Sequence, residues 1–229
     1  MPEAELDELE RYLANAEILD VAAFSQTTAH HSYRLILEGG VAVLAKPADT
    51  APEGVIMCRR EAAAWVLARA LGWPDLVSTT VMRVITSPSS GEEVETSVQV
   101  IWPDYLPDAD VALFSDADIW RAAVFDAIVG HADRGGHNWL AVPGSSRSPH
   151  LKLVDHGYAF PEATSPPSST FYELRRGQEL PDAVSDSLGD FVARRSGLEH
   201  LHELLPSAAA DAVFERAETL LSSSVLEIS

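Results

Sequence analysis

The segment from His131 to Asn138, together with the turn that follows it, carries the side chains best suited to chemistry. It reads His-Ala-Asp-Arg-Gly-Gly-His-Asn, and Asp155-His156-Gly157 begins seventeen residues after its end. An acidic side chain such as Asp133 can orient or deprotonate a hydroxyl that accepts a phosphoryl group. Oxygens from Asn138 and Asp155 are ligands that magnesium prefers beside nucleotide phosphates. These residue types, in this order, favour phosphoryl transfer.

The spacing of these residues matches the loops of protein kinases, H-R-D-x-x-x-x-N followed by D-F-G. Asp133 and Asn138 are five residues apart, and His131 lies two residues before Asp133. Asp155 likewise precedes Gly157 by two residues, within a strand, loop, strand order. Each piece alone is typical of an ordinary turn. Their conjunction predicts a nucleotide-phosphate site.

Two residues upstream supply the other half of such a site. Only two of the 16 basic residues are lysines, Lys46 and Lys152. Lys46 ends a predicted strand, and Glu61 lies in the first turns of the helix that follows. A compact ammonium held by a helix carboxylate suits the α and β phosphates of a nucleotide, where the planar fork of arginine would not. Each residue alone would be assigned to the solvated surface, but with the downstream loops they predict phosphate binding.

A different chemistry would use some of the same side chains. Nitrogen and oxygen ligands for zinc, manganese or iron in a hydrolase would come from His131, Asp133, His137, Asp155 and His156. This alternative leaves Lys46, Glu61 and the amide of Asn138 without a role, so it ranks below the phosphate site. In the preferred interpretation, His137 and His156 are hydrogen-bonded loop residues.

The net charge of the chain argues against nucleic acids and anionic membranes as partners. Sixteen Lys plus Arg face 35 Asp plus Glu, which gives a net charge of −19. Such a field repels phosphate backbones and anionic headgroups, so we expect neither nucleic-acid binding nor stable membrane association. The single cysteine, Cys58, cannot form an internal disulfide, and the acidic opening differs from a signal peptide. Because no apolar run approaches the ~18 residues that span a bilayer, we expect a soluble, cytoplasmic protein.

The order of predicted elements indicates an α+β fold with two lobes. Residues 1–102 would form an N-lobe. It would begin with a helix over 3–16, whose leucines at 6, 9 and 13 have the spacing of an amphipathic helix, and continue with three strands over 18–46, the last two a hairpin around the Glu38-Gly39-Gly40 turn. A helix over 58–73 and strands over 76–85 and 93–102 would complete it. Residues 103–107 would be a hinge. Residues 108–229 would form a mostly helical C-lobe that carries both loops. It would contain a helix that opens at a capping box of Ser115 and Asp118 and ends at residue 130, an exposed Pro/Ser-rich loop over 161–181, and two or three helices over 182–223.

At these residues the sequence resembles a known group of kinases. HADRGGHNWL together with VDHGYAFP looks like the catalytic and magnesium-binding loops of the phosphatidylinositol 3/4-kinase-like group, above all the type II phosphatidylinositol 4-kinases. The loops are also similar to those of HipA-like bacterial kinases and of small actinobacterial proteins described as such kinases. The resemblance covers about residues 17–180. It implies a bilobal protein-kinase-like fold whose N-lobe has antiparallel strands plus one helix.

The resemblance also implies a role for each matching position. Asp133 would be the catalytic acid/base, and Asn138 and Asp155 would hold Mg²⁺ or Mn²⁺. Lys46 would bind the phosphates of ATP, with Glu61 as its partner on the helix.

Two further segments would contact ATP if the resemblance holds. The polar loop over 25–31 would cover the phosphates with Ser25, Thr27 and Thr28. This loop departs from the protein-kinase pattern because it has no glycine, although the lipid-kinase and HipA-like groups tolerate a Ser-rich loop. Adenine would be hydrogen-bonded by backbone groups of Val100, Ile101 and Trp102.

The acceptor does not follow from the resemblance. Type II lipid kinases use a cysteine-rich lipidated segment and a basic membrane-facing surface, and this chain offers neither. We therefore expect an ATP- and Mg²⁺-dependent bacterial kinase that phosphorylates a hydroxyl of a protein Ser/Thr or of a small molecule. The alternatives are a phosphoinositide kinase, a catalytically weak pseudokinase that binds nucleotide, and the metal-dependent hydrolase. Arg134, Arg175 and Arg176 are expected to be solvated surface residues, with contact to an anionic acceptor as the alternative.

Overall fold

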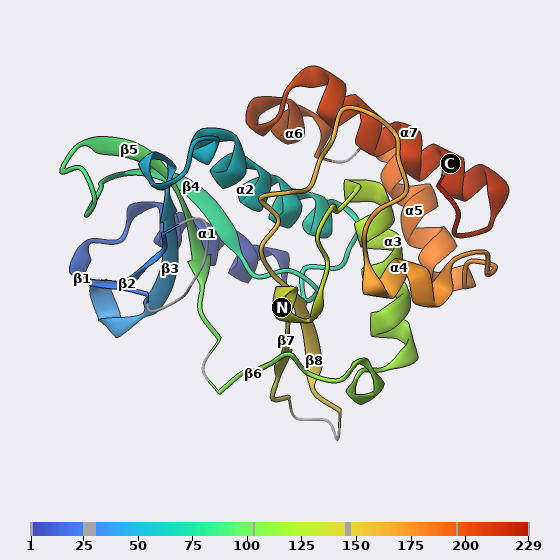
Figure 1. Ribbon diagram of the computed structural model, residues 1–229, viewed down its shortest axis with the longest axis horizontal. Coiled ribbons are helices and arrows are strands. Elements are labelled where there is room, and N and C mark those ends of the chain that lie inside the picture. Colours follow the sequence, from blue (N-terminus) through green and yellow to red (C-terminus); the bar gives the residue numbers. More distant parts are fainter. Residues whose placement is uncertain (1, 25–30, 103, 145–147, 196, 229) are drawn as a thin grey trace. The chain divides into compact units, whose positions relative to one another are not determined.

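The computed structural model describes residues 2–24, 31–102, 104–144, 148–195 and 197–228 (Figure 1). The chain forms two compact units, the first comprising Met1–Ala62 with Ser78–Ile101 and the second Ala63–Val77 with Trp102–Ser229. Residues 63–77, assigned above to the N-lobe, thus group with the second unit. Their contacts explain this grouping, because the Trp73 indole N–H donates to Ser187 Oγ at 3.3 Å.

The first unit contains a five-stranded antiparallel sheet in the order β1-β2-β3-β5-β4. Its strands are β1 (Ile18–Ala23), β2 (Tyr33–Leu37), β3 (Ala42–Pro47), β4 (Thr80–Thr86) and β5 (Glu93–Val100). The predicted hairpin is confirmed, with Tyr33 paired to Ala45. Its turn requires glycine, since Gly39 adopts φ 83°, a region that costs side-chain-bearing residues energy. This hairpin places Lys46 near the end of β3.

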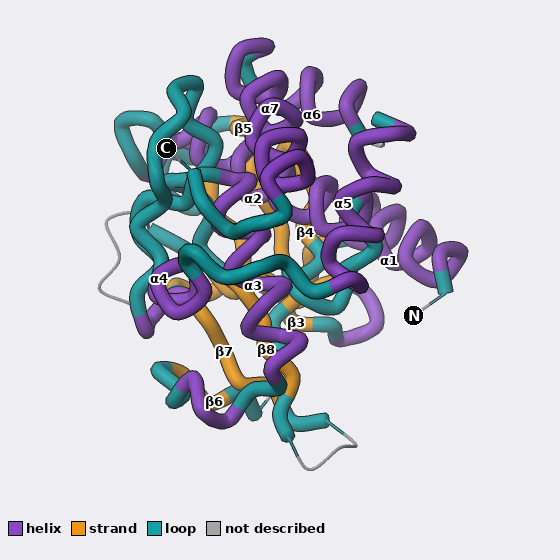
Figure 2. The backbone as a smooth tube through the Cα atoms, turned by 90° about the vertical axis from the view of Figure 1, so that its right-hand side faces the viewer, coloured by secondary structure: helices purple, strands orange, loops and turns teal. Residues whose placement is uncertain are grey.

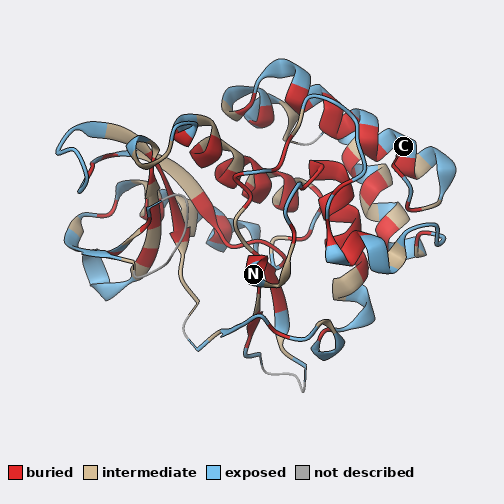
Figure 3. Cartoon of the chain, viewed as in Figure 1, coloured by how far each residue is buried: buried red, intermediate tan, exposed pale blue. Residues whose placement is uncertain are grey.

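One face of this sheet carries the core of the first unit. Helix α1 (Glu3–Asn15) buries Leu6 and Leu13, as its leucine spacing predicts. On β2 and β3, alternate side chains such as Leu35 and Val43 belong to the hydrophobic core of this unit, and Figure 3 marks the buried residues in red. Because neighbouring residues of a strand point to opposite faces, Lys46 lies on the face opposite to this core.

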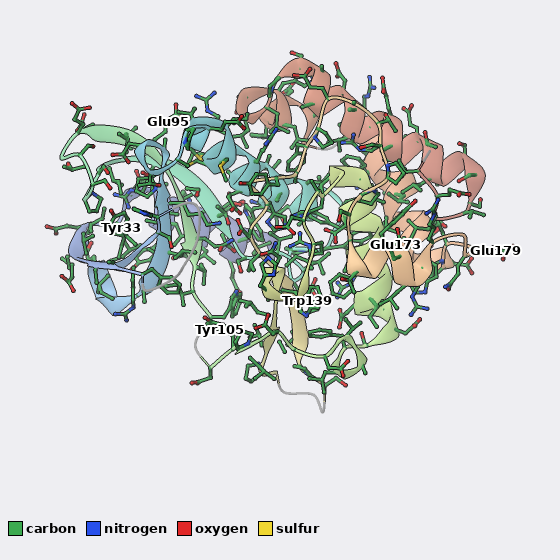
Figure 4. All side chains as sticks on the ribbon, in the orientation of Figure 1. Tyr33, Glu95, Tyr105, Trp139, Glu173 and Glu179 are labelled. Atoms are coloured by element: carbon green, nitrogen blue, oxygen red, sulfur yellow. The ribbon has the colours of Figure 1, made fainter. Side chains whose placement is uncertain are left out.

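Helix α2 (Gly54–Ala70) begins in the first unit and continues into the second. It starts before the predicted boundary at residue 58 and ends before residue 73. Two ion pairs join it to the strands: Lys46 of β3 meets Glu61, and Glu95 of β5 (labelled in Figure 4) accepts hydrogen bonds from Arg59 at 2.7 and 2.9 Å. Helix α2 therefore lies along the Lys46 side of the sheet.

The second unit is mainly helical. Its described helices are α3 (Asp116–Val129), α4 (Thr170–Arg175), α5 (Asp182–Arg194), α6 (Leu198–Leu204) and α7 (Ser207–Ser223). Helix α7 packs against α3, α5 and α6 (Figure 2), and Phe214 of α7 stacks on Phe191 of α5 with ring centroids 4.5 Å apart. The predicted capping box at the start of α3 is confirmed, since Ser115 Oγ accepts a hydrogen bond from the Asp118 N–H at 3.1 Å.

A three-stranded sheet of β6 (Leu106–Pro107), β7 (Trp139–Val142) and β8 (His150–Leu153) completes the second unit. Residues 106 and 107, predicted to lie in a hinge, thus pair with β7. The prediction that residues 161–181 form only a loop is wrong, because α4 lies within this range. Ser169 caps α4 through the Tyr172 N–H, and Phe171 and Tyr172 are buried. None of the helices in the described ranges is long and apolar enough to cross a membrane.

Candidate functional site

The loop over 131–138 begins where α3 ends. Gly130 terminates the helix in the left-handed conformation, with φ 58°, and His131 follows as a fully buried side chain. His131 Nδ1 accepts a hydrogen bond from the Asp133 N–H at 3.1 Å, so Nε2 carries the proton and donates to the Asp155 carbonyl oxygen at 3.0 Å. One imidazole thus joins Asp133 to Asp155.

These contacts weigh against the hydrolase alternative. A metal ligand must offer a ring nitrogen with a free lone pair, and neither nitrogen of His131 meets this condition. His156 is buried with its ring edge-on to Phe125 and His131. Within the ranges that the structure describes, no group of three or more His, Cys, Asp or Glu side chains is arranged to hold a metal.

Asp133 and Asn138 occupy different environments within the same loop. The Asp133 carboxylate is more than half exposed and lies 3.8 Å from His137 Nε2, so it is accessible to a reactant. Asn138 is buried, and its amide Nδ2 donates to the Asp133 carbonyl oxygen at 2.5 Å. This bond orients the side-chain amide, and Oδ1 is the atom of Asn138 that could bind a cation.

Asp155 lies two residues after the end of β8. It adopts φ 59°, a left-handed conformation that aspartate tolerates better than most residues. Its backbone oxygen is held by His131, and the preceding Val154 N–H donates to the Asn138 carbonyl oxygen at 3.1 Å. Asn138 and Asp155 therefore belong to two hydrogen-bonded segments. An amide oxygen and a carboxylate are hard ligands, which fit Mg²⁺ or Mn²⁺ completed by phosphate and water oxygens.

Arg134 is the residue whose role the sequence did not reveal, and the expectation that it is solvated is wrong. Its side chain is fully buried against Asp126 of α3, with Nε 3.1 Å from Oδ1. A charged residue inside the apolar run AAVFDAIV was the available signal, because a buried carboxylate needs a partner. The other two arginines contact acids of the same chain: Arg175 pairs with Asp116, and Arg176 Nη2 lies 3.8 Å from Glu227.

In the first unit, Lys46 and Glu61 form a close ion pair. Lys46 Nζ lies 2.5 Å from Glu61 Oε1, and the two side chains are 14% and 3% exposed. The backbone oxygen of Lys46 also accepts a hydrogen bond from the Cys58 thiol at 2.9 Å. Burial is the main cause that raises the pKa of Cys58 to about 11, so this thiol stays protonated at neutral pH. The structure thus brings together the lysine and the helix carboxylate that the sequence paired.

The predicted adenine and phosphate segments are placed only in part. Val100 pairs with Val43 in the sheet, and its N–H donates to the Thr79 carbonyl oxygen at 3.1 Å. The predicted contacts of Val100, Ile101 and Trp102 with adenine stay a prediction. The Trp102 ring lies under Lys152, with Nζ 4.5 Å from the ring centroid. Ser25, Thr27 and Thr28 lie outside the described residues.

Comparison with known proteins gives a fold and no family. No family model matches the chain, and no curated protein matches it. The crystal structure of the Golgi casein kinase with Mn/ADP bound superimposes with a TM-score of 0.71 at 17% identity, covering 99% of this chain and 77% of that one. The Helicobacter pylori proinflammatory kinase CtkA gives a TM-score of 0.55 at 12% identity, covering 93% of this chain and 95% of that one. The chain has a protein-kinase-like fold.

The kinase-like fold confirms the predicted fold class, a mixed α+β chain with an antiparallel sheet and a mostly helical remainder. At these identities the likeness concerns the fold alone. The finer resemblance to type II phosphatidylinositol 4-kinases and HipA-like kinases stays a prediction.

Proposed function

We propose that this protein is a metal-dependent kinase that transfers the γ-phosphate of ATP to a hydroxyl. The observation that carries the proposal is the hydrogen-bonded frame of the second unit. There, His131 joins Asp133 to Asp155, and Asn138 bonds to both segments. A general base and two metal ligands held on one frame are what phosphoryl transfer needs.

Each side chain receives one role in the proposed reaction. Lys46, held by Glu61, would bind the α and β phosphates. Asn138 and Asp155 would hold Mg²⁺ or Mn²⁺, which neutralises charge on the phosphates. Asp133 would orient the acceptor hydroxyl and take its proton while the new oxygen–phosphorus bond forms and the β–γ bridge breaks, so that ADP leaves. The Golgi casein kinase structure contains Mn and ADP, which supports a nucleotide and a divalent metal as the molecules bound here.

For the acceptor, we propose a protein Ser/Thr or small-molecule hydroxyl in a bacterial cytoplasm. The net charge of −19 favours neutral or cationic acceptors and disfavours an anionic membrane surface. A phosphoinositide kinase is therefore the weaker alternative. A pseudokinase would bind nucleotide without turnover, but the exposed Asp133 carboxylate favours catalysis.

The first test is metal-dependent stabilisation by nucleotide. ADP with MnCl₂ or MgCl₂ should raise the melting temperature of the full chain, because a ligand at a hundred times its Kd adds about 2.7 kcal/mol to the free energy of unfolding. Asp155→Ala should abolish the metal-dependent part of this shift. Asp190→Ala is the matched control, since Asp190 is an exposed carboxylate of α5 paired with Arg194; it should keep the full shift.

Transfer of labelled phosphate from ATP then separates the alternatives. Asp133→Asn should bind Mn²⁺ and ADP like the wild type yet transfer phosphate about 10² to 10⁴ times more slowly. Nucleotide binding by the wild type without turnover on peptide or small-molecule acceptors would indicate the pseudokinase. The proposal fails if ATP with metal neither stabilises the wild type nor is consumed.

A further inference from the structure

Arg134 holds the two predicted metal-ligating segments from inside the second unit. Its guanidinium Nη1 donates to the Asn138 carbonyl oxygen at 2.6 Å and to the Val154 carbonyl oxygen at 2.5 Å. Asn138 is itself one proposed ligand, and Val154 directly precedes the other, Asp155. A single buried group thus bonds to the backbone of both segments.

Asp126 fixes the guanidinium from the side of α3. Arg134 Nε lies 3.1 and 3.2 Å from the two carboxylate oxygens of Asp126, and both side chains are fully buried. A planar guanidinium held at a carboxylate has little freedom to rotate. Helix α3, which carries neither Asn138 nor Asp155, therefore sets the direction of Nη1. Through Nη1 it also sets the position of the Asn138 and Val154 carbonyl groups.

The same carboxylate connects this pair to the segment before α4. Ser169 Oγ donates to Asp126 Oδ2 at 2.7 Å and accepts a hydrogen bond from the Tyr172 N–H at 3.2 Å. Ser169 therefore caps α4 and bonds to the partner of Arg134 with one hydroxyl.

Backbone hydrogen bonds align residues 168–170 with the loop that carries Asp133. The Ser168 N–H donates to the His131 carbonyl oxygen at 2.8 Å, and the Arg134 N–H donates to the Ser168 carbonyl oxygen at 2.9 Å. The Thr170 N–H donates in turn to the Arg134 carbonyl oxygen at 3.2 Å. These bonds bracket Asp133 on both sides.

We propose that Arg134 is a positioning residue that sets the relative placement of Asn138 and Asp155, and that the 168–170 segment acts on these ligands through Ser169 and Asp126. This inference rests on the proposed function, since it assigns metal ligation to Asn138 and Asp155. Residues that orient metal ligands without touching the metal typically change its affinity 10- to 100-fold. Cation affinity is therefore the quantity that Arg134 should control.

The main experiment replaces the buried pair by apolar side chains of similar size. A buried ion pair replaced as a whole by apolar residues often leaves a protein stable, whereas removing one partner does not. Asp126→Leu combined with Arg134→Met should therefore fold but bind Mn²⁺ at least about 10-fold more weakly, measured on the full chain with ADP by electron paramagnetic resonance. Metal-free ADP affinity should stay within about twofold of the wild type, because Lys46 and Glu61 are unchanged.

A control variant separates positioning from general loss of stability. Arg83 of β4 also binds two carbonyl oxygens, those of Leu13 and Ala16, at 3.1 Å each. Arg83→Met should lower the melting temperature and leave the Mn²⁺ affinity at the wild-type value. Arg134→Lys keeps the charge but not the fork, so it should give an intermediate Mn²⁺ affinity.

If the double variant does not fold, two milder variants test whether Asp126 and Arg134 position the metal ligands. Ser169→Ala removes the bond to Asp126, and it should weaken Mn²⁺ binding and speed amide exchange in residues 131–139 and 153–157. Ser115→Ala is matched to it, because Ser115 likewise caps a helix and donates to a carboxylate, that of Asp118 at 2.8 Å, and it should leave Mn²⁺ binding unchanged.

The inference is wrong if the double variant binds Mn²⁺ as tightly as the wild type. If the double variant does not fold, the same result in Ser169→Ala decides. Either result leaves the proposed function standing. A wild-type chain that binds no Mn²⁺ with ADP overturns both.

Discussion

At the scale of single residues, the two lysines have opposite environments. Lys46 is paired with Glu61 at 2.5 Å. Lys152 is buried, and its Nζ donates no hydrogen bond within the described part of the chain; the ammonium lies over the Trp102 ring, 4.5 Å from its centroid. Burial lowers the pKa of Lys152 to about 8, against an attraction to Asp75 that raises it. Asp75 accepts hydrogen bonds from Arg121 on both of its oxygens, at 2.9 and 3.0 Å. The rarity of lysine pointed to Lys46 and gave no hint that Lys152 is buried.

Lys152→Met should raise the free energy of unfolding at neutral pH. A shift of the pKa from 10.5 to about 8 means that the charged Lys152 lowers the free energy of unfolding by about 3 kcal/mol at neutral pH. Methionine removes this cost but also loses the cation–π contact, which is worth about 1 kcal/mol. We expect a gain of about 2 kcal/mol at pH 7, measured by urea unfolding.

The stability gain of Lys152→Met should depend on pH. The folded chain holds fewer protons on Lys152 than the unfolded chain between about pH 8 and 10.5, so the contribution of Lys152 to the free energy of unfolding becomes more favourable as the pH rises through that window. The advantage of Lys152→Met should therefore shrink as the pH passes through it. Lys46→Met should act in the opposite direction at pH 7, because it leaves the buried Glu61 carboxylate without this ammonium. A loss of stability for Lys152→Met at pH 7 would contradict the assignment.

At the scale of elements, the junction after α3 controls where the 131–138 loop begins. Gly130 has φ +58°, and a Cβ atom there would lie 2.8 Å from Cγ of Pro161. The Phe160 N–H donates to the Val129 carbonyl oxygen at 2.6 Å, so the chain after Gly157 returns to the end of α3. Helix end and returning chain are therefore in direct contact, with no room for a side chain.

Gly130→Ala should be strongly destabilising. A left-handed conformation costs alanine about 1 to 2 kcal/mol, and the Pro161 ring would also have to move. Gly72→Ala is the matched comparison, because Gly72 has φ +74° and nothing within 4 Å of the added Cβ. We expect Gly72→Ala to cost only the conformational penalty and Gly130→Ala to exceed it by at least about 1 kcal/mol in urea unfolding. Equal losses for the two variants would show that Pro161 does not constrain the turn.

At the scale of the whole molecule, the excess of acid is the dominant feature. A net charge of −19 over 229 residues opposes compaction through repulsion among the carboxylates. Isolated surface ion pairs, such as Arg194 with Asp190, contribute little against this repulsion. The chain should therefore respond to salt as a polyanion.

Added salt should raise the melting temperature. Going from roughly 10 mM to roughly 100 mM NaCl shortens the Debye length from about 30 Å to about 10 Å, which screens repulsion in the folded chain more than it weakens exposed ion pairs. KCl should give the same increase, since screening depends on ionic strength alone. A melting temperature that falls or stays constant would show that attractive pairs outweigh the repulsion.

Much of the local structure could be predicted from the sequence. Leucine spacing predicted α1, Ser115 predicted the start of α3, and the two glycines after Glu38 predicted the hairpin that ends at Lys46. These features depend on residues close together in the chain, where backbone preferences and caps act. The loop motif that carries Asp133 and Asn138 could be recognised for the same reason, because its residues are close together in the chain.

The sequence by itself determined the fold class, the loop motifs and the charge of this protein. Only the tertiary structure decided that Arg134 is buried against Asp126, that His131 uses both ring nitrogens, and that α4 replaces part of a predicted loop. Each of these depends on which residue a buried polar group meets. Such a partner is supplied by another segment of the folded chain, and the cost of leaving the group unpaired holds the two together.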